Sequence, residues 1–224
     1  MKNKNRKCNR TMSFYFICMF PVVLFFLAGC NMSVNKDIEI DDGEKVGSSQ
    51  NSVNGNISVG SDCEVRGSCR SVNGNIRIEN HSRISALQTV NGQIRVDSEV
   101  MVRGNIESVN GSVVCDSAVE VSGSVTTVNG SVDLENTLVR RDISTYNGDV
   151  TLLDKSIVRG DIVVKKSRGR SNRVTPLEIK IMNGSVVEGN ILVEDDRMDV
   201  KVILADGGIV NGEIRDAEVI REDF

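Results

Sequence analysis

A four-residue motif, T/S-V-N-G or a close variant, recurs six times in the middle of the chain. The six asparagines follow one another at steps of 18 or 19 residues. A fixed period of this size predicts a repeat architecture, in which each unit packs only against its neighbours and stability grows by stacking. The Asn-Gly pairs of the motif are Asn54-Gly55, Asn73-Gly74, Asn91-Gly92, Asn110-Gly111, Asn129-Gly130 and Asn147-Gly148.

Apolar residues occupy the same places in each repeat. With the asparagine as position 1, they recur at positions 4 and 6, as in Ile57 and Val59, with a polar residue between them. This alternation predicts a short strand with one face inward. A V-x-G-x-I stretch follows, as in Val102 to Ile106, and the valine before each asparagine, such as Val53, supplies a third apolar place. Three apolar clusters in each period predict a three-sided coil.

We therefore expect an all-β fold, a single-stranded, three-sided parallel β-helix (β-solenoid) with 18–19 residues per coil and about nine coils over residues 35–214. We expect the glycine after each motif asparagine to adopt a positive φ, and the asparagines to form a hydrogen-bonded ladder from coil to coil. An antiparallel meander is the competing fold, because Asn-Gly also favours a two-residue hairpin turn. Three apolar clusters per period, rather than two, disfavour it.

Two later Asn-Gly pairs, at Asn183 and Asn211, do not fit the period. The pattern continues if Ile179 and Ile181 are placed at positions 4 and 6. This register requires an insertion, residues 165–175, between two coils. We therefore interpret the two late pairs as turns of another kind.

The first thirty residues differ from the rest. A basic start, an apolar run over residues 12–28 and the sequence LAGC ending at Cys30 are typical of a secretory signal, residues 1–29. LAGC resembles the lipobox of bacterial lipoproteins, which implies cleavage before Cys30, lipidation of Cys30 and anchoring to a membrane through several acyl chains. By the same resemblance Asn31 favours the outer membrane. Residues 30–34 would then be a short tether.

Three cysteines remain after Cys30, namely Cys63, Cys69 and Cys115. An envelope compartment is oxidising, and an odd number leaves at least one free thiol unless a partner supplies another. Cys69 and Cys115 occupy inward positions, where they act as small core residues. Whether Cys63 and Cys69 form a disulfide is left undecided by the sequence.

Composition excludes some functions. The chain has 27 Lys+Arg against 31 Asp+Glu, no Trp, and 4% aromatic residues. Nucleic-acid binding is not expected, since it needs a basic face or stacking aromatics. Enzyme activity is not expected either: paired carboxylates resemble those of glycosidases, but no aromatic platform accompanies them. We interpret His81, the single histidine, as a solvated turn residue.

Two charged features are candidate sites. Position 7 carries acids in five coils, and Arg77 and Arg95 can pair with two of them, Glu79 and Asp97. The least compensated group could bind Ca²⁺ through oxygen ligands or form a solvated acidic edge; it comprises Asp116, Asp133 and Glu135. No other cofactor is expected. The insertion is basic and could contact an anionic envelope component or a protein partner, or be a solvated loop. Its charges are Lys165, Lys166, Arg168, Arg170 and Arg173.

The V-x-G-x-I stretches resemble the triangular right-handed β-helix of the bactofilins, which are polymer-forming cytoskeletal proteins. The chain is still more similar to bacterial β-solenoid proteins with serial T/S-V-N-G repeats. Bactofilins lack a lipobox, so we expect a membrane-anchored envelope lipoprotein that acts as a non-enzymatic structural or interaction module, in the manner of an adhesin. The alternatives are a bactofilin-like scaffold and a β-helical carbohydrate-active enzyme. Whether the chain is a monomer or an end-to-end polymer stays open, and residues 215–224 are expected to form a charged cap.

Overall fold

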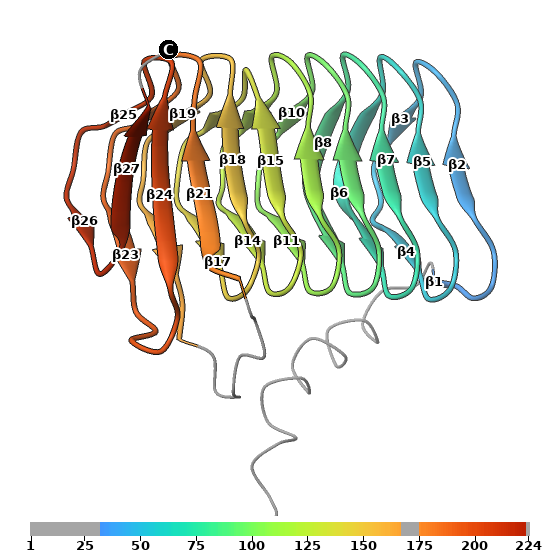
Figure 1. Ribbon diagram of the computed structural model, residues 1–224. Helices are drawn as coiled ribbons and strands as arrows, with labels where there is room; N and C mark the ends of the chain where they lie inside the picture. The colour runs from blue at the N-terminus through green and yellow to red at the C-terminus, as the bar shows by residue number, and fades with distance from the viewer. Residues whose placement is uncertain (1–31, 167–174, 223–224) are drawn as a thin grey trace, which may run out of the picture. The chain divides into compact units, whose positions relative to one another are not determined.

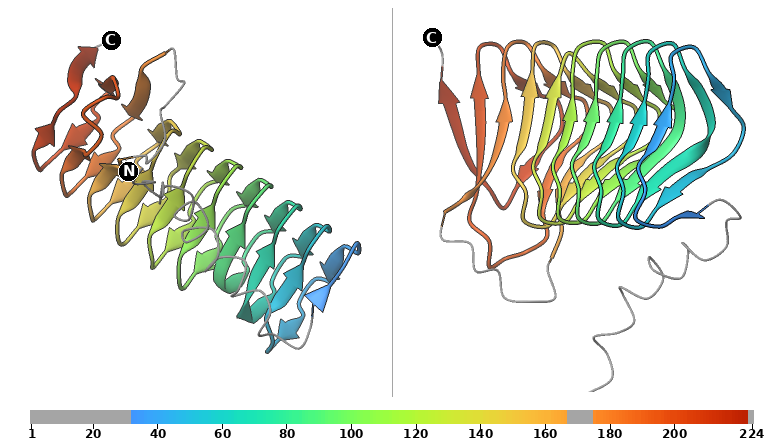
Figure 2. Two further views of the ribbon diagram at one scale, coloured as in Figure 1. Left: turned by 90° about the horizontal axis from the view of Figure 1, so that it is seen from below. Right: turned by 90° about the vertical axis from the view of Figure 1, so that its right-hand side faces the viewer.

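The computed structural model describes residues 32–166 and 175–222, which form a parallel β-solenoid of about nine coils. The strands lie side by side along one axis, from β2 at one end to β27 at the other (Figure 1). The same stack of coils is seen from below and from the right-hand side of Figure 1 (Figure 2). The predicted fold class is confirmed, and the antiparallel meander is excluded because the strand pairs are all parallel in the described part of the chain.

The first side of each coil is a three- to six-residue strand with positions 4 and 6 inward. Ten such strands form one sheet. They are β2 (Ile38–Ile40), β5 (Ile57–Val59), β7 (Ile76–Ile78), β9 (Ile94–Val96), β12 (Val113–Cys115), β15 (Val132–Glu135), β18 (Val150–Leu153), β21 (Leu177–Ile181), β24 (Val200–Ala205) and β27 (Glu218–Glu222).

The second and third sides form one sheet of 17 strands, because β6 (Glu64–Ser71) and β8 (Arg83–Thr89) run through the corner between them. The second side also contains β3 (Lys45–Val46), β10 (Met101–Val102), β13 (Glu120–Val121), β16 (Leu138–Val139), β19 (Ile157–Val158), β22 (Val186–Val187) and β25 (Ile209–Val210). The third side also contains β1 (Met32–Ser33), β4 (Gln50–Ser52), β11 (Ile106–Ser108), β14 (Val125–Thr127), β17 (Ile143–Thr145), β20 (Ile162–Val164), β23 (Ile191–Val193) and β26 (Ile214–Arg215).

Equivalent residues of successive coils lie next to each other. Ile57 pairs with Ile76, and Ile76 pairs with Ile94. Across the insertion, Val150 pairs with Ile179. The register predicted for the coils that follow the insertion is therefore confirmed, and each inward residue packs on its own equivalents.

The core is a set of buried apolar columns. Positions 4 and 6 and both ends of V-x-G-x-I are buried except in the end coils, where residues such as Ile38 and Val210 are partly buried, and Cys69 and Cys115 are buried as predicted. The third inward place was wrongly predicted: the valine before each asparagine, such as Val72, is only half-buried, whereas the Ser or Thr before it is buried. The buried hydroxyl is stabilised by a hydrogen bond: Ser71 Oγ donates to the Gly55 carbonyl at 2.9 Å.

The asparagine ladder is confirmed. Each motif asparagine donates its Nδ2 to the Oδ1 of the asparagine one coil earlier, at 2.5–2.9 Å from Asn54 to Asn147. Side chains at the other corners cap backbone amides instead: Asn56 Oδ1 accepts from the Asn75 amide at 2.9 Å, and Asn105 Oδ1 accepts from Ser124 at 3.1 Å. In the described residues, every buried side-chain N or O atom has a hydrogen-bond partner.

The expected positive φ of the motif glycines is wrong. Among the described glycines, positive φ occurs only at Gly43, Gly184 and Gly207. Gly74 is required for another reason: a Cβ there would lie 2.5 Å from the Gly55 carbonyl carbon and still closer to its oxygen. The motif glycine thus allows the corners of two coils to approach closely.

Both ends carry strands that the sequence did not predict. In the expected tether, Met32 and Ser33 pair with Asn51 and Ser52 of β4. In the expected cap, β27 pairs with β24, so the charged segment adds a tenth strand to the first side. Arg221 lies at an inward position, opposite Leu204. Within the described residues, no helix is both long and apolar enough to cross a membrane.

Candidate interaction surface

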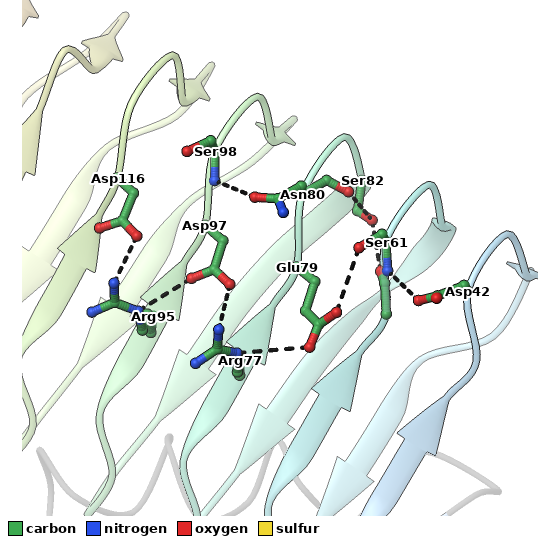
Figure 3. Close-up of polar contacts among 11 residues, drawn as sticks. Asp42, Ser61, Arg77, Glu79, Asn80, Ser82, Arg95, Asp97, Ser98 and Asp116 are labelled. Carbon is green, nitrogen blue, oxygen red and sulfur yellow. Dashed lines mark hydrogen bonds and ion pairs between the residues drawn. The ribbon is translucent and has the colours of Figure 1, made fainter.

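A ladder of ion pairs crosses the outer face of β7, β9 and β12 (Figure 3). Arg77 lies 3.9 Å from the carboxylate of Glu79, which directly follows β7, and 2.6 Å from that of Asp97, which directly follows β9. Arg95 repeats the arrangement, at 3.1 Å from Asp97 and 2.7 Å from Asp116. Each arginine therefore links the carboxylates of two coils.

This ladder changes the expectation for the acidic group. Asp116 is paired with Arg95, whereas the sequence indicated no compensating cation for it. Asp133 accepts a hydrogen bond from Ser131 at 2.7 Å, and Glu135 accepts one from Ser117 at 3.3 Å. The three predicted Ca²⁺ ligands do not converge, and the described residues contain no group of three or more His, Cys, Asp or Glu side chains that could hold a metal ion.

Gly60 occupies position 7, where most neighbouring coils carry an acidic residue. It lines an open depression of about 510 Å³ near the start of the solenoid. Asp42 and Glu79 lie on either side of Ser61 (Figure 3). Asp42 Oδ1 accepts from the Ser61 amide at 2.7 Å, and Ser61 Oγ lies 3.4 Å from Glu79 Oε2. The remaining lining residues are Glu39, Ile40, Asp41 and Ser58. The depression is acidic, but its carboxylates do not form a metal-ligand group.

The three cysteines are free and buried, so the structure contains no Cys63–Cys69 disulfide. Burial raises the pKa of the Cys69 and Cys115 thiols to about 12, which keeps both protonated at neutral pH. Burial also raises the pKa of Cys63, whose Sγ donates to the Asp41 carbonyl at 3.0 Å. These environments are the opposite of those that activate a thiol nucleophile.

His81 lies in an exposed turn with a φ of 59°. Its Nε2 is 3.5 Å from Glu99 Oε2, and both side chains are more than half exposed. The position matches the predicted turn residue and brings the imidazole near an acid rather than near a nucleophile.

The basic insertion is described only at its ends. Lys166 Nζ lies 2.7 Å from Asp196 Oδ1, with both side chains exposed. The other predicted contact residues Arg168, Arg170 and Arg173 lie outside the described residues, as do Cys30 and the signal segment. Lys165 is described, and its amide donates to the Thr145 carbonyl at 2.8 Å.

A second insertion, which the sequence analysis missed, follows one coil later at the same corner. Val164 pairs with Val193, and both strands are followed by extra residues before the next strand begins. In the second insertion, the Asp195 side chain is 1% exposed and accepts from Arg197 Nε and Nη2, both at 2.7 Å. The Asp195–Arg197 pair thus stabilises the turn that contains Asp196, and Asp196 contacts Lys166 of the first insertion.

An apolar stripe runs along the outer face of the second side. It consists of Leu138, Ile157, Val186 and Ile209, one from each of four successive strands. The first three are half-buried and Ile209 is 50% exposed. Earlier coils place Arg83, Met101 and Glu120 in the same row.

The first side changes in the same coils. Leu153 pairs with Glu135 at position 7, and Met182 follows Leu153 one coil later. These two outward rows therefore change from charged or polar residues in the early coils to apolar residues in the later ones, whereas the outer face of β21 and β24 still carries ion pairs such as that of Lys180 with Glu178. Aligning the coils on V-x-G would have shown the stripe in the sequence, because each member directly precedes that valine.

No protein-family model matches this chain, and neither a curated protein nor a solved structure matches it.

Proposed function

We propose that this protein is a lipid-anchored, non-enzymatic β-solenoid of the bacterial cell envelope that presents the apolar stripe to a partner protein. The observation that carries the proposal is the stripe itself. Contiguous apolar side chains on the outside of a soluble fold are typical of interaction sites. Here they form one row, from Leu138 to the half-exposed Ile209, in a position that earlier coils fill with Arg83, Met101 and Glu120.

The anchoring part of the proposal rests on the LAGC sequence and on the short distance along the chain between Cys30 and β1. Lipid on Cys30 would hold the first coil near the outer membrane, because only Asn31 separates it from Met32. The strands that carry the stripe, from β16 to β25, extend from the middle of the stack to the end away from β2; β19 and β25 are labelled in Figure 1. Anchoring would thus leave the stripe accessible to a partner in the envelope.

Fatty-acid labelling of cells that produce the full chain tests the anchor. Cys30→Ser is expected to abolish the label and the cleavage of the signal segment. Cys18→Ser, within the apolar run, serves as the matched control and is expected to keep both. Labelling that persists in Cys30→Ser would refute the lipidation.

Photocrosslinking in the same cells tests the stripe. A photoreactive amino acid at Ile157 or Val186 is expected to give the same defined adduct, and Ile209→Ser is expected to reduce its yield. The outward residue Ser58, on β5 of the first side, is the control position and is expected to give no such adduct. Equal adducts from all three positions would refute a dedicated interaction face.

A further inference from the structure

Eight Asn-Gly pairs lie in the described residues, six in the ladder and two outside it. Asn-Gly is the dipeptide most open to spontaneous deamidation, because glycine has no side chain to hinder attack by its own amide nitrogen. The reaction needs a freely rotating asparagine side chain and a backbone that can bend into a five-membered ring. Its rate in a folded protein therefore reports how firmly each asparagine is held.

The ladder asparagines are held firmly. Asn91 donates to Asn73 at 2.7 Å and accepts from Asn110 at 2.7 Å, so both ends of its side-chain amide are engaged. The backbone amide of the following glycine is also bound in several coils. For example, the Gly130 amide donates to Thr127 Oγ1 at 3.1 Å.

Asn183 is held by a neighbouring coil. Its Nδ2 donates to Asp154 Oδ1 at 2.8 Å, and its carbonyl accepts from the Lys155 amide at 3.0 Å. The Gly184 amide donates to the Asp206 carbonyl at 2.9 Å. This pair is therefore fixed between the coil before it and the coil after it.

Asn211 differs from the other seven. It is exposed, and its side chain makes no hydrogen bond to any residue of the described part of the chain. It follows β25, the last described strand of the second side, so a coil packs against this corner from one direction only. The Gly212 amide is engaged at 3.1 Å with the Gly189 carbonyl, and this is the contact that must open for reaction.

We propose that Asn211 is a site of spontaneous deamidation. The Gly212 amide nitrogen loses its proton and attacks Asn211 Cγ, the new C–N bond closes a succinimide, and the side-chain nitrogen leaves as ammonia. Water then opens the ring at either carbonyl, which gives aspartate or isoaspartate. The reaction consumes one water, releases one ammonia and involves no change of oxidation state.

Deamidation would place a negative charge next to the end of the apolar stripe. The new carboxylate lies two residues after Ile209 and in the same outward row as Glu188, since Val187 pairs with Val210. Isoaspartate also lengthens the backbone by one carbon at a corner where the Glu213 amide donates to Asn190 Oδ1 at 2.9 Å. We expect the modified form to be more acidic there and its last coil to be less tightly attached.

Peptide mapping by mass spectrometry tests the proposal. The full chain is incubated at mildly alkaline pH, and the conversion of each asparagine to aspartate or isoaspartate is measured over time. Asn211 is expected to convert about tenfold faster than any ladder asparagine, the ratio that corresponds to about 1.4 kcal/mol of ladder hydrogen bonding. In denaturant all eight pairs are expected to convert at similar rates.

Two variants separate the structural cause from the local sequence. Asn211→Gln, which cannot close the five-membered ring, is expected to remove the fast conversion. Asn91→Ala deprives Asn110 of its ladder acceptor and is expected to speed conversion at Asn110 several-fold. Equal rates at all eight pairs in the folded protein, or a ladder asparagine that converts before Asn211, would overturn the proposal.

Discussion

Arg95 Nη2 lies 2.7 Å from the carboxylate of Asp116, which belongs to the next coil. Through its Nε, the same guanidinium pairs with Asp97 of its own coil. The Asp97 side chain is 12% exposed. A single side chain thus offsets the repulsion between carboxylates that stacking would otherwise place about 4.8 Å apart.

Arg95→Gln is expected to lower the free energy of unfolding by about 1 kcal/mol, since two carboxylates lose a partner. The loss is expected to shrink at high salt, because screening weakens the repulsion. Urea denaturation at low and high salt measures both effects. Arg66→Gln is the control, because the Arg66 side chain is 69% exposed and, among the described residues, forms an ion pair with Glu64 alone, so its effect should be smaller. Equal losses in the two variants would contradict the bridging role.

Gly111→Ala is expected to cost about 1–3 kcal/mol of stability through overpacking. The new Cβ would lie 3.0 Å from the Gln93 amide nitrogen and closer still to the Gly92 carbonyl. Gly47→Ala is the control, because nothing lies within 4 Å of a Cβ at that glycine. Thermal melting of the two variants compares them, and a similar Tm would refute the role of close coil contact.

Asn91→Ala removes two ladder hydrogen bonds, one to Asn73 and one from Asn110. We expect it to lower the free energy of unfolding by about 2 kcal/mol. Asn211→Ala, outside the ladder, is expected to change it by less than about 0.5 kcal/mol. Denaturant titration distinguishes the two, and a neutral Asn91→Ala would show that the ladder adds nothing to stability.

Stability is expected to fall at alkaline pH because of the buried thiols. The pKa of Cys69 and Cys115 is about 12 in the folded chain against an ordinary value of 9.0, so the unfolded chain loses these protons first. Their contribution is fully present below pH 9.0 and is lost as the pH rises toward 12. The slope is at most about 1.4 kcal/mol per pH unit for each thiol.

Urea denaturation at several pH values measures this slope. The double variant Cys69→Ala/Cys115→Ala is expected to be less stable at neutral pH. Above pH 9.0, the ordinary thiol pKa, its free energy of unfolding is expected to fall less steeply with pH than that of the unmodified protein. An unchanged slope in the variant would show that other groups cause the alkaline loss. Thiol reagents give a second measure, since both cysteines are expected to react only after unfolding.

The coil period and register could be predicted because every inward residue stacks on its own equivalents. A favourable residue at Ile57 is therefore favourable again at Ile76 and Ile94, and the sequence repeats the solution. The same logic placed Ile179 and Ile181 correctly beyond the insertion.

The corners were harder to predict. Hydrophobicity favours Val72 over Ser71 as the inward residue, but the Gly55 carbonyl needs a donor and the serine hydroxyl supplies it. The role of the motif glycine was wrong for a similar reason, since the carbonyl of the preceding coil, rather than local φ, excludes a side chain there.

The outer surface could be predicted least. The contact from Arg95 to Asp116 spans 21 residues and depends on how a long side chain bends across a coil boundary. The contact of Lys166 with Asp196 depends on a second insertion, which a register fitted to the core alone does not reveal.

Arg221 places a charged side chain at the β27 end of the stack. Arg221 pairs with Leu204 and so follows the last residue of a column that is otherwise apolar, and its side chain is exposed. Any strand added at that end, from a second copy or from a misfolded segment, would have to strip water from a positive charge without offering it a counter-ion. The charge on Arg221 thus makes the addition of another strand beyond β27 unfavourable, in the way that charged residues protect the edges of sheets in other proteins.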